Sequence, residues 1–387
     1  MKGTRNLAIV AFLLLVACPL LGQPGQGQGA EHAAVLIPDS SLEHAEDVGV
    51  RAHTNHLIKF DPQYVGTSPS GETPASIGVV YALPNPNTGG SGTIAIVDAY
   101  HYATAANDLN VFSQTFKLPA ANFQVVYAAG KQPRSNCGWA QEAALDIEWA
   151  HAMAPGASIV LVEAASSSFA DLFKAVDVAK ALNGVTQVSM SWGGSEFSSE
   201  TSNDSHLLQS GVVFFASSGD TGGVTIYPGT SPNVVSAGGT TIHRSGSVFT
   251  GETGWSGSGG GPSKYEPRPT YQNNISTIVG NARGVPDFSF DADPNSGVSV
   301  YDSTSCQGAS GWLVFGGTSV SSPSLAGIVN LAGGAASSVD ELAMIYANFG
   351  NTADFRDITS GTAGSFTAAA GWDFVTGVGS NQGLSGK

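Results

Sequence analysis

A serine at the start of a predicted helix is the first residue of this sequence with a clear chemical use. Ser319 follows Gly316-Gly317-Thr318, and the small and apolar residues after it predict a helix over Thr318–Leu331. A serine there lies near unpaired backbone N–H groups and the positive end of the helix dipole, which favour negative charge on a substrate oxygen. Ser319 is therefore a candidate nucleophile, although serine is also a common helix N-cap.

Two carboxylates lie four residues apart in a second predicted helix, Trp139–Met153. This spacing puts Glu142 and Asp146 on one helix face, with roughly 5–6 Å between their Cβ atoms. Their neighbours are mostly Ala, Leu and Trp, with no Lys or Arg at helical spacing. If the pair is buried, both carboxylates cannot easily ionise, so one pKa rises and the two share a proton. The alternative is a solvated acidic face.

A serine nucleophile needs a base, and a carboxylate with a raised pKa can serve in acid, whereas a histidine is charged below about pH 5. Glu142 would then take the proton of Ser319, and Asp146 would hold Glu142. Asp220 follows a Ser-Ser-Gly turn. If it is neutral in acid, it can donate a hydrogen bond to the developing oxyanion. Its other common role is to cap the turn itself.

The elements that position these residues alternate between short apolar runs and helical segments. Near-continuous apolar strands separated by helices predict an α/β fold with a mostly parallel central sheet covered by helices on both faces. Asp98 and Asp220 then lie at carboxyl ends of strands, where active sites of such folds gather. The predicted strands are Thr93–Val97, Gln124–Ala128, Ser158–Glu163, Val185–Trp192, Val212–Ala216 and Val234–Ala237, and the further predicted helices are Ala103–Phe116, Phe169–Leu182 and Ser205–Gln209.

The composition excludes some partners. The chain has 387 residues and a net charge of −15, which makes nucleic acid an unsuitable partner. Residues 1–22 carry Lys2 and Arg5 before an apolar run that is short for a membrane span, which predicts a secretory signal. Leu15-Val16-Ala17-Cys18 also resembles a lipoprotein box, so a lipid anchor at Cys18 is the alternative to secretion.

Two cysteines, Cys137 and Cys306, remain after the signal. In an oxidising compartment an even pair predicts one disulfide, and two buried thiols are the alternative. Residues 23–72 read as a short leader, in which His53 and His56 are interpreted as surface or linker residues because no metal-ligating partner is well placed.

Taken together, the motifs resemble those of the sedolisins, the serine-carboxyl peptidases. The resemblance rests on Glu142-x-x-x-Asp146, Ser218-Gly219-Asp220 and Gly317-Thr318-Ser319-x-x-x-Pro323 in that order, and it runs from about Thr73 to Gly383. It implies a subtilisin-like fold over a peptidase domain at 73–387. It also implies acid endopeptidase activity on protein or peptide substrates through an acyl-enzyme, with Ser319, Glu142, Asp146 and Asp220 in the roles given above. The family usually carries a large prosegment, and residues 23–72 would be a reduced one. A monomer is expected.

The resemblance also implies a calcium site near the C-terminus. Hard oxygen ligands suit Ca²⁺. The carboxylates would come from Asp357 and Asp373, and backbone carbonyls from Ile358, Ala369 and Gly371. From the residues alone, the stretch is a Gly-rich terminal loop.

Two other functions are compatible with the sequence. A subtilisin-type Asp-His-Ser peptidase would use Asp98, His151 and Ser319, although His151 lies in what reads as a helix end. A catalytically silent, secreted binding or scaffold protein could keep the same fold, and the short leader favours it. All four catalytic positions are filled, which favours the enzyme.

Overall fold

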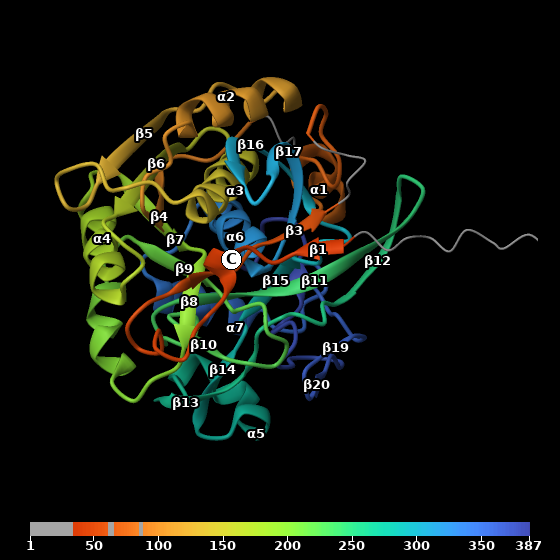
Figure 1. The fold of residues 1–387 in the computed structure, drawn as a ribbon. Helices are drawn as coiled ribbons and strands as arrows, with labels where there is room; N and C mark the ends of the chain where they lie inside the picture. Colours follow the sequence, from red (N-terminus) through yellow and green to blue (C-terminus); the bar gives the residue numbers. More distant parts are fainter. Residues whose placement is uncertain (1–33, 61–65, 85–87) are drawn as a thin grey trace, which may run out of the picture. The chain divides into compact units, whose positions relative to one another are not determined.

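A computed structural model describes residues 34–60, 66–84 and 88–387. Its centre is a ten-stranded sheet (Figure 1). Seven consecutive strands of this sheet are parallel, each to its neighbour. In spatial order these are β15 (Phe288–Asp291), β11 (Val235–Ser245), β9 (Val213–Ser217), β7 (Val185–Met190), β4 (Thr93–Ala99), β6 (Ser158–Ala164) and β5 (Phe123–Tyr127). The predicted mostly parallel sheet is confirmed.

Antiparallel strands complete this sheet. β12 (Val248–Gly254) pairs with β11, and β18 (Phe355–Arg356) pairs with β21 (Ser380–Asn381), which joins β15 in parallel. The edges of the sheet are thus built from the C-terminal part of the chain on one side and β5 on the other.

Helices cover both faces because alternate strand residues point to opposite sides. Ile94 and Ile96 of β4 pack in the cluster that contains α3 (Cys137–Met153) and α6 (Thr318–Ala332), and α2 (Ala105–Phe116) lies on the same side. Ala95 and Val97 pack instead with α4 (Phe169–Ala181). α3 and α6 pack against each other in the middle of the view in Figure 1.

Two small sheets tie the N-terminal segment to this body. β2 (His53–Thr54) pairs with β8 (Trp192–Ser195), and β8 pairs with β10 (Ile226–Tyr227). The second sheet has the order β1-β3-β17-β16, with β1 at Ala34–Leu36, β3 at Leu57–Phe60, β17 at Ala309–Gly316 and β16 at Val298–Cys306.

The remaining elements are short or lie near the C-terminus. They are α1 (Pro74–Val80), α5 (Ser276–Val279), α7 (Ser338–Ala347), β13 (Gly261–Pro267), β14 (Ala282–Val285), β19 (Thr362–Ala363), β20 (Phe366–Thr367), and three 3₁₀ helices at Asp39–Ser41, Glu200–Leu207 and Thr270–Ile275.

Two local predictions differ from the structure, and a third, the disulfide, is confirmed. The predicted strand Val185–Trp192 is two strands, because the chain changes sheet at Ser191 between β7 and β8. The predicted helix Ser205–Gln209 is wrong, since a 3₁₀ helix covers Glu200–Leu207 instead. Cys137 and Cys306 form a disulfide with a Cα–Cα distance of 5.3 Å, which joins the start of α3 to the end of β16.

The described residues contain no helix with the length and apolarity needed to cross a bilayer. The predicted signal at 1–22 and Cys18 lie outside the described residues.

Candidate active site

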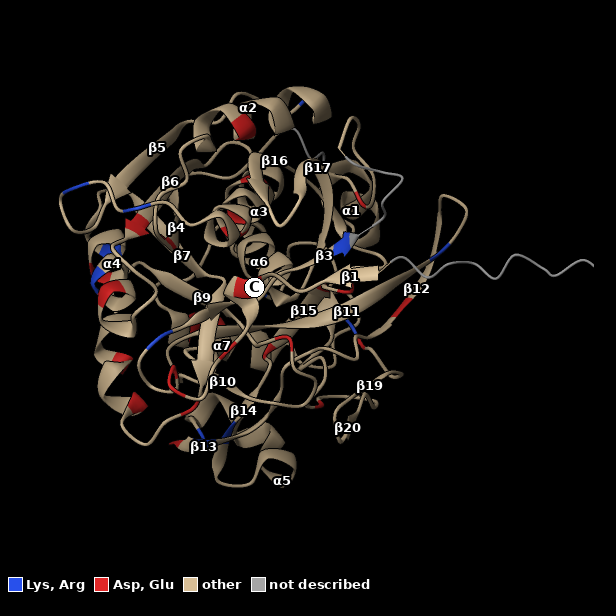
Figure 2. Cartoon of the chain, viewed as in Figure 1, with Lys and Arg blue, Asp and Glu red and all other residues tan. Residues whose placement is uncertain are grey.

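α3 presents the two predicted carboxylates in the interior of the protein. The helix begins after Asn136, whose side chain accepts a hydrogen bond from Trp139 N at 3.1 Å. Every residue from Gly138 to Met153 is buried, so a solvated acidic face is excluded. Glu142 and Asp146 have no exposed surface, and the acidic positions of α3 are red in Figure 2.

A third carboxylate, Asp98 at the end of β4, belongs to the same cluster. Burial raises its pKa well above the usual range, and the negative charges of Glu142 and Glu163 add to the shift. Burial likewise raises the pKa of Asp146, as do the charges of Asp98 and Glu142, while a 2.8 Å hydrogen bond from Ser191 Oγ opposes it. Asp146 therefore keeps a proton in acid and can share it with Glu142, as expected for buried like charges.

Ser319 lies at the second position of α6, and this helix begins directly after a glycine that the site requires. Gly317 has a φ of +93°, and a Cβ there would lie 2.2 Å from Asn55 O and 2.5 Å from Asp220 Oδ2. Only glycine fits so close an approach with this φ. Ser319 is fully buried, and its Oγ donates to Ser191 O at 3.2 Å.

Asp220 reaches the start of α6 from the loop after β9. Its Oδ1 accepts hydrogen bonds from Thr318 N at 2.7 Å and from Thr318 Oγ1 at 2.8 Å. Oδ2 is buried without a partner, although the residue as a whole is only partly buried. This enclosure raises the pKa of Asp220 to about 8, and the charge of Glu142 adds to it. Asp220 therefore carries a proton in acid and can donate it in a hydrogen bond.

Asn55 and His56 complete the site, and the sequence interpretation of His56 as a surface or linker residue is wrong. His56 is fully buried, with Nδ1 2.9 Å from Glu142 Oε2 and its ring stacked on Phe315. Asn55 O accepts a hydrogen bond from Ser319 N at 3.0 Å. The preceding sequence has no periodicity that would place it against residues 142 and 319, so only the tertiary fold reveals this contact.

The alternative Asp-His-Ser arrangement is not assembled. His151 Nε2 hydrogen-bonds Pro119 O at 3.0 Å, and burial lowers the pKa of His151. Its Nδ1 is buried without a hydrogen-bond partner. Among the described residues both oxygens of Asp98 lack a hydrogen-bond partner, and its charge acts on Asp146 rather than on this histidine.

The five predicted calcium ligands lie in one C-terminal region. Gly371 N donates to Asp357 Oδ2 at 3.1 Å, and Ala369 N donates to Asp373 Oδ2 at 3.0 Å. The two carboxylates thus both accept hydrogen bonds from the backbone of the same short loop. Among the described residues, the carbonyls of Ile358, Ala369 and Gly371 accept no hydrogen bond, so they keep free acceptor capacity. This donor set fits an oxygen-preferring cation. The described chain contains no cluster of three or more His, Cys, Asp or Glu suited to a metal.

Known proteins resemble this chain in both sequence and fold. A family model described as the subtilase family matches residues 126–379. Kumamolisin of Bacillus sp. (strain MN-32) is 28% identical over 381 residues, covering 84% of this chain and 65% of the relative. Sedolisin of Pseudomonas sp. (strain 101) is 25% identical over 356 residues, covering 80% and 60%. With xanthomonalisin of Xanthomonas sp. (strain T-22) included, the match spans 47% to 65% of the length of these curated relatives.

Solved structures give the same result. Pseudomonas sedolisin, a serine-carboxyl proteinase solved with two molecules of pseudo-iodotyrostatin, has a TM-score of 0.70 at 25% identity and covers 81% of this chain and 96% of its own. Sphericase, at 19% identity and a TM-score of 0.52, covers 81% of this chain and 99% of its own and shares the fold. The family match, the curated relatives and the fold agree that this chain belongs to the subtilase family and, within it, to the sedolisins.

Proposed function

We propose that this chain is a serine-carboxyl endopeptidase that hydrolyses protein or peptide substrates in acid. Ser319 is the nucleophile, Glu142 the general base, Asp146 its partner and Asp220 the oxyanion donor. The proposal is supported by the family and by the burial of all three carboxyl groups around the start of α6.

The reaction would proceed through an acyl-enzyme. Ser319 Oγ attacks the substrate carbonyl while its proton passes to Glu142, and the oxyanion is stabilised by Ser319 N–H and protonated Asp220. Glu142 then protonates the leaving amine. Water attacks the ester in the second half of the reaction, with Glu142 again as base. Asp146, whose pKa is raised, holds a proton against Glu142 throughout.

One observation carries this proposal. Asn55 O, a backbone carbonyl oxygen, accepts from Ser319 N at 3.0 Å. This oxygen and Asp220 Oδ2 lie 2.2 Å and 2.5 Å from the position of a Cβ on Gly317. A peptide carbonyl oxygen therefore accepts from the N–H that the mechanism assigns to the oxyanion, and it borders the same point beside Gly317 as Asp220 Oδ2.

Calcium would stabilise the C-terminal loop rather than take part in the reaction. Asp357 and Asp373 would supply carboxylate oxygens, and Ile358, Ala369 and Gly371 backbone carbonyls. A bound Ca²⁺ would neutralise the two acidic side chains and cross-link the loop.

Secretion is proposed from residues 1–22, with lipid anchoring at Cys18 as the other form of export. Residues 73–387 would form the peptidase domain, active as a monomer.

The test is cleavage of a denatured protein across about pH 3–8 by the wild type, Ser319→Ala and Glu142→Gln, with products identified by mass spectrometry. We expect activity in acid that both substitutions abolish. Activity that peaks near neutral pH and survives Glu142→Gln would point to a histidine base. No cleavage at any pH by the folded, calcium-loaded protein would favour the silent binding protein.

A further inference from the structure

The segment from Val50 to Asn55 lies in the site as an extended peptide. On one side, Phe169 N donates to Val50 O at 3.0 Å, and Ala52 N donates to Ser167 O at 2.9 Å. On the other side, β2 pairs antiparallel with β8. A strand added between two backbone edges is one of the ways in which proteins bind an extended peptide. The contacts of this segment therefore indicate which groups a bound substrate would meet.

Asn55 is the residue of this segment that lies at the proposed nucleophile. Its carbonyl oxygen accepts a hydrogen bond from Ser319 N at 3.0 Å, and its backbone nitrogen lies 3.3 Å from Ser191 O. The N–H of Ser319 is one of the two groups assigned above to the oxyanion. Asn55 thus lies where the substrate residue on the acyl side of the scissile bond would lie, and its side chain lies in the pocket that would receive that residue.

The pocket around the Asn55 side chain is closed and polar. Asn55 is only 1% exposed, and its Nδ2 donates to Ser217 Oγ at 2.7 Å. Ser217 is fully buried at the end of β9, and this is the one hydrogen bond of its hydroxyl to the described residues. Asn55 Oδ1 and the hydroxyl of the next residue, Ser218, are also buried, and neither has a partner in the described part of the chain. A substrate side chain without a donor would leave Ser217 Oγ buried without the hydrogen bond that it accepts here, which costs free energy.

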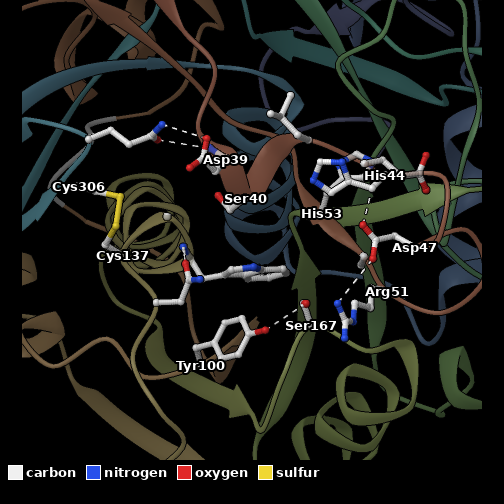
Figure 3. Close-up of a pocket in the computed structure, with 17 residues that line it drawn as sticks. Asp39, Ser40, His44, Asp47, Arg51, His53, Tyr100, Cys137, Ser167 and Cys306 are labelled. Carbon is white, nitrogen blue, oxygen red and sulfur yellow. Dashed lines mark hydrogen bonds and ion pairs between the residues drawn. A yellow bond between two sulfur atoms is a disulfide. The ribbon is translucent and has the colours of Figure 1, made fainter.

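Two positions nearer the N-terminus are less enclosed. Arg51 is exposed, and His53 is only partly buried. Figure 3 shows both side chains beside a cavity of about 280 Å³ that lies along this segment. Because a cavity leaves room for side chains of different size and charge, these two positions should discriminate less between substrates than the closed pocket at Asn55.

We propose that Ser217 selects substrates with asparagine on the acyl side of the scissile bond. The inference rests on the peptidase function proposed above and names the substrate class of the same site. Ser217 Oγ accepts a hydrogen bond from the carboxamide of the substrate, which holds that residue with its carbonyl oxygen at Ser319 N. Ser217 contacts the substrate side chain and no reacting atom, so it determines specificity and takes no part in the chemical steps.

Two other side chains separate the effect of hydrogen bonding from that of size. Leucine branches at the same carbon as asparagine but has no donor, so it would leave Ser217 Oγ unpaired. Glutamine has the same carboxamide on a longer stem, and a closed pocket must shift to admit the additional methylene group. A site that hydrogen-bonds a substrate group discriminates strongly against an analogue that lacks the group. We therefore expect asparagine to be preferred over both.

The test compares peptides that differ in one residue, Ala-His-Thr-Xaa followed by one constant sequence, with asparagine, leucine or glutamine at Xaa. The purified full chain is assayed at about pH 4, and mass spectrometry identifies the bond that is cut. The kcat/KM of the wild type should be about ten- to a hundredfold higher for the asparagine peptide than for the leucine peptide. Ser217→Ala removes the acceptor, so its values for these two peptides should lie within about threefold of each other.

Ser236→Ala is the matched control. Ser236 is a buried serine of the neighbouring strand β11, where it pairs with Ala216, and its hydroxyl has no hydrogen-bond partner among the described residues. This variant should keep the wild-type preference, and circular dichroism shows whether both variants are folded. A digest of a denatured protein by the wild type gives a second measurement that needs no variant, because asparagine should be enriched immediately before the cuts.

The outcomes separate this inference from the proposed function. Cleavage in acid with an equal or higher kcat/KM for the leucine peptide, or cuts without enrichment of asparagine, would overturn the inference and leave the peptidase function standing. A preference for asparagine that persists in folded Ser217→Ala would also overturn the inference, because another group would then recognise the side chain. Absence of cleavage of every peptide and of the denatured protein would overturn the function and the inference together.

Discussion

Ser191 uses two different groups to connect the proposed nucleophile with the buried carboxylates. Its Oγ donates to Asp146 Oδ1 at 2.8 Å, and its backbone carbonyl accepts from Ser319 Oγ at 3.2 Å. It lies at the point where the chain leaves β7 for β8. The position of Ser191 therefore affects both the pKa of Asp146 and the direction in which the Ser319 hydroxyl points.

At Asp220 the proposed role gives a pH signature. The pKa of about 8 means that the carboxyl is protonated in acid and loses its donor as the pH rises through that value. Asp220→Asn keeps a donor at every pH, so we expect it to retain activity in acid and lose less activity toward pH 8 than the wild type. The kcat of Asp220→Ala should be about 10²–10³-fold lower than that of the wild type. Profiles of kcat/KM against pH for the three proteins check this.

A result in which Asp220→Asn and Asp220→Ala lose the same activity at every pH would contradict the oxyanion role. The hydrogen bonds from Thr318 would then be the main contribution of Asp220, as a structural residue.

A site residue can be predicted from the sequence only where a local pattern marks it. Glu142 and Asp146 are predictable because helical spacing and an apolar setting identify them. His56 is not predictable, because its contact with Glu142 spans 86 residues of sequence and no periodicity marks it. Asp98 lies between these cases, since its place at a strand end is predictable but its part in the carboxyl cluster is not.

Among the elements, α6 offers a matched pair of glycines at its two ends. Gly317 before the helix and Gly333 after it both have positive φ, at +93° and +108°. A Cβ on Gly317 would collide with Asn55 O and Asp220 Oδ2, whereas a Cβ on Gly333 would meet nothing within 4 Å.

Gly317→Ala should therefore abolish activity on an added substrate, because the methyl group fills the position of the substrate carbonyl. Gly333→Ala should keep activity and lose about 1 kcal/mol of unfolding free energy from backbone strain alone. Urea unfolding and peptide hydrolysis measure the two effects. Full activity in Gly317→Ala would show that the carbonyl position assigned here is wrong.

The C-terminal loop gives a test that does not depend on activity. If Asp357 and Asp373 bind Ca²⁺, a chelator should lower the Tm. Added Ca²⁺ at about 100 times its Kd should raise the free energy of unfolding by about 2.7 kcal/mol. Asp357→Asn should reduce this response. Asp340→Asn is the control, because Asp340 lies on α7 and accepts a hydrogen bond from Ser337 Oγ; it should not change the response to Ca²⁺. Calorimetric titration with Ca²⁺ gives the affinity. An equal rise in Tm with Ca²⁺ for both variants would show that Ca²⁺ does not bind in this loop.

The sequence predicts α2, α3, α4 and α6 and six of the seven parallel strands, but it misses β15 and α7. α3 and α6 begin and end within two residues of their predicted bounds, since a cap or a glycine marks their starts. The sequence does not reveal the pairing of β2 with β8 or of β3 with β17, because β2, β3 and β8 have only two to four residues and carry no usable alternation.

For the whole molecule, buried carboxyl groups with raised pKa values set the direction of pH-dependent stability. Burial raises the pKa of Glu200 to about 9, of Glu266 to about 8 and of Asp302 to about 7. The folded chain then binds more protons than the unfolded chain, so the free energy of unfolding falls as the pH rises from about 4 toward these values. His151, with a lowered pKa, opposes this trend.

We therefore expect a higher Tm at about pH 4.5 than at about pH 7.5. Glu200→Gln should narrow the difference, because Gln stays neutral at both pH values. Glu46→Gln, at an exposed position, should leave the difference unchanged. Differential scanning calorimetry at the two pH values measures it, and a Tm that rises toward neutral pH would contradict the effect.

The position of β3 beside β17 determines which shortened chains can be handled in solution. It covers the edge of β17, and an edge strand that loses its neighbour exposes unpaired N–H and C=O groups to other chains. A shortened chain that begins at His56 keeps this cover, whereas one that begins after Phe60 uncovers β17. The first should remain in solution on concentration, and the second should aggregate, so the loss of the five residues 56–60 separates a storable protein from one that precipitates.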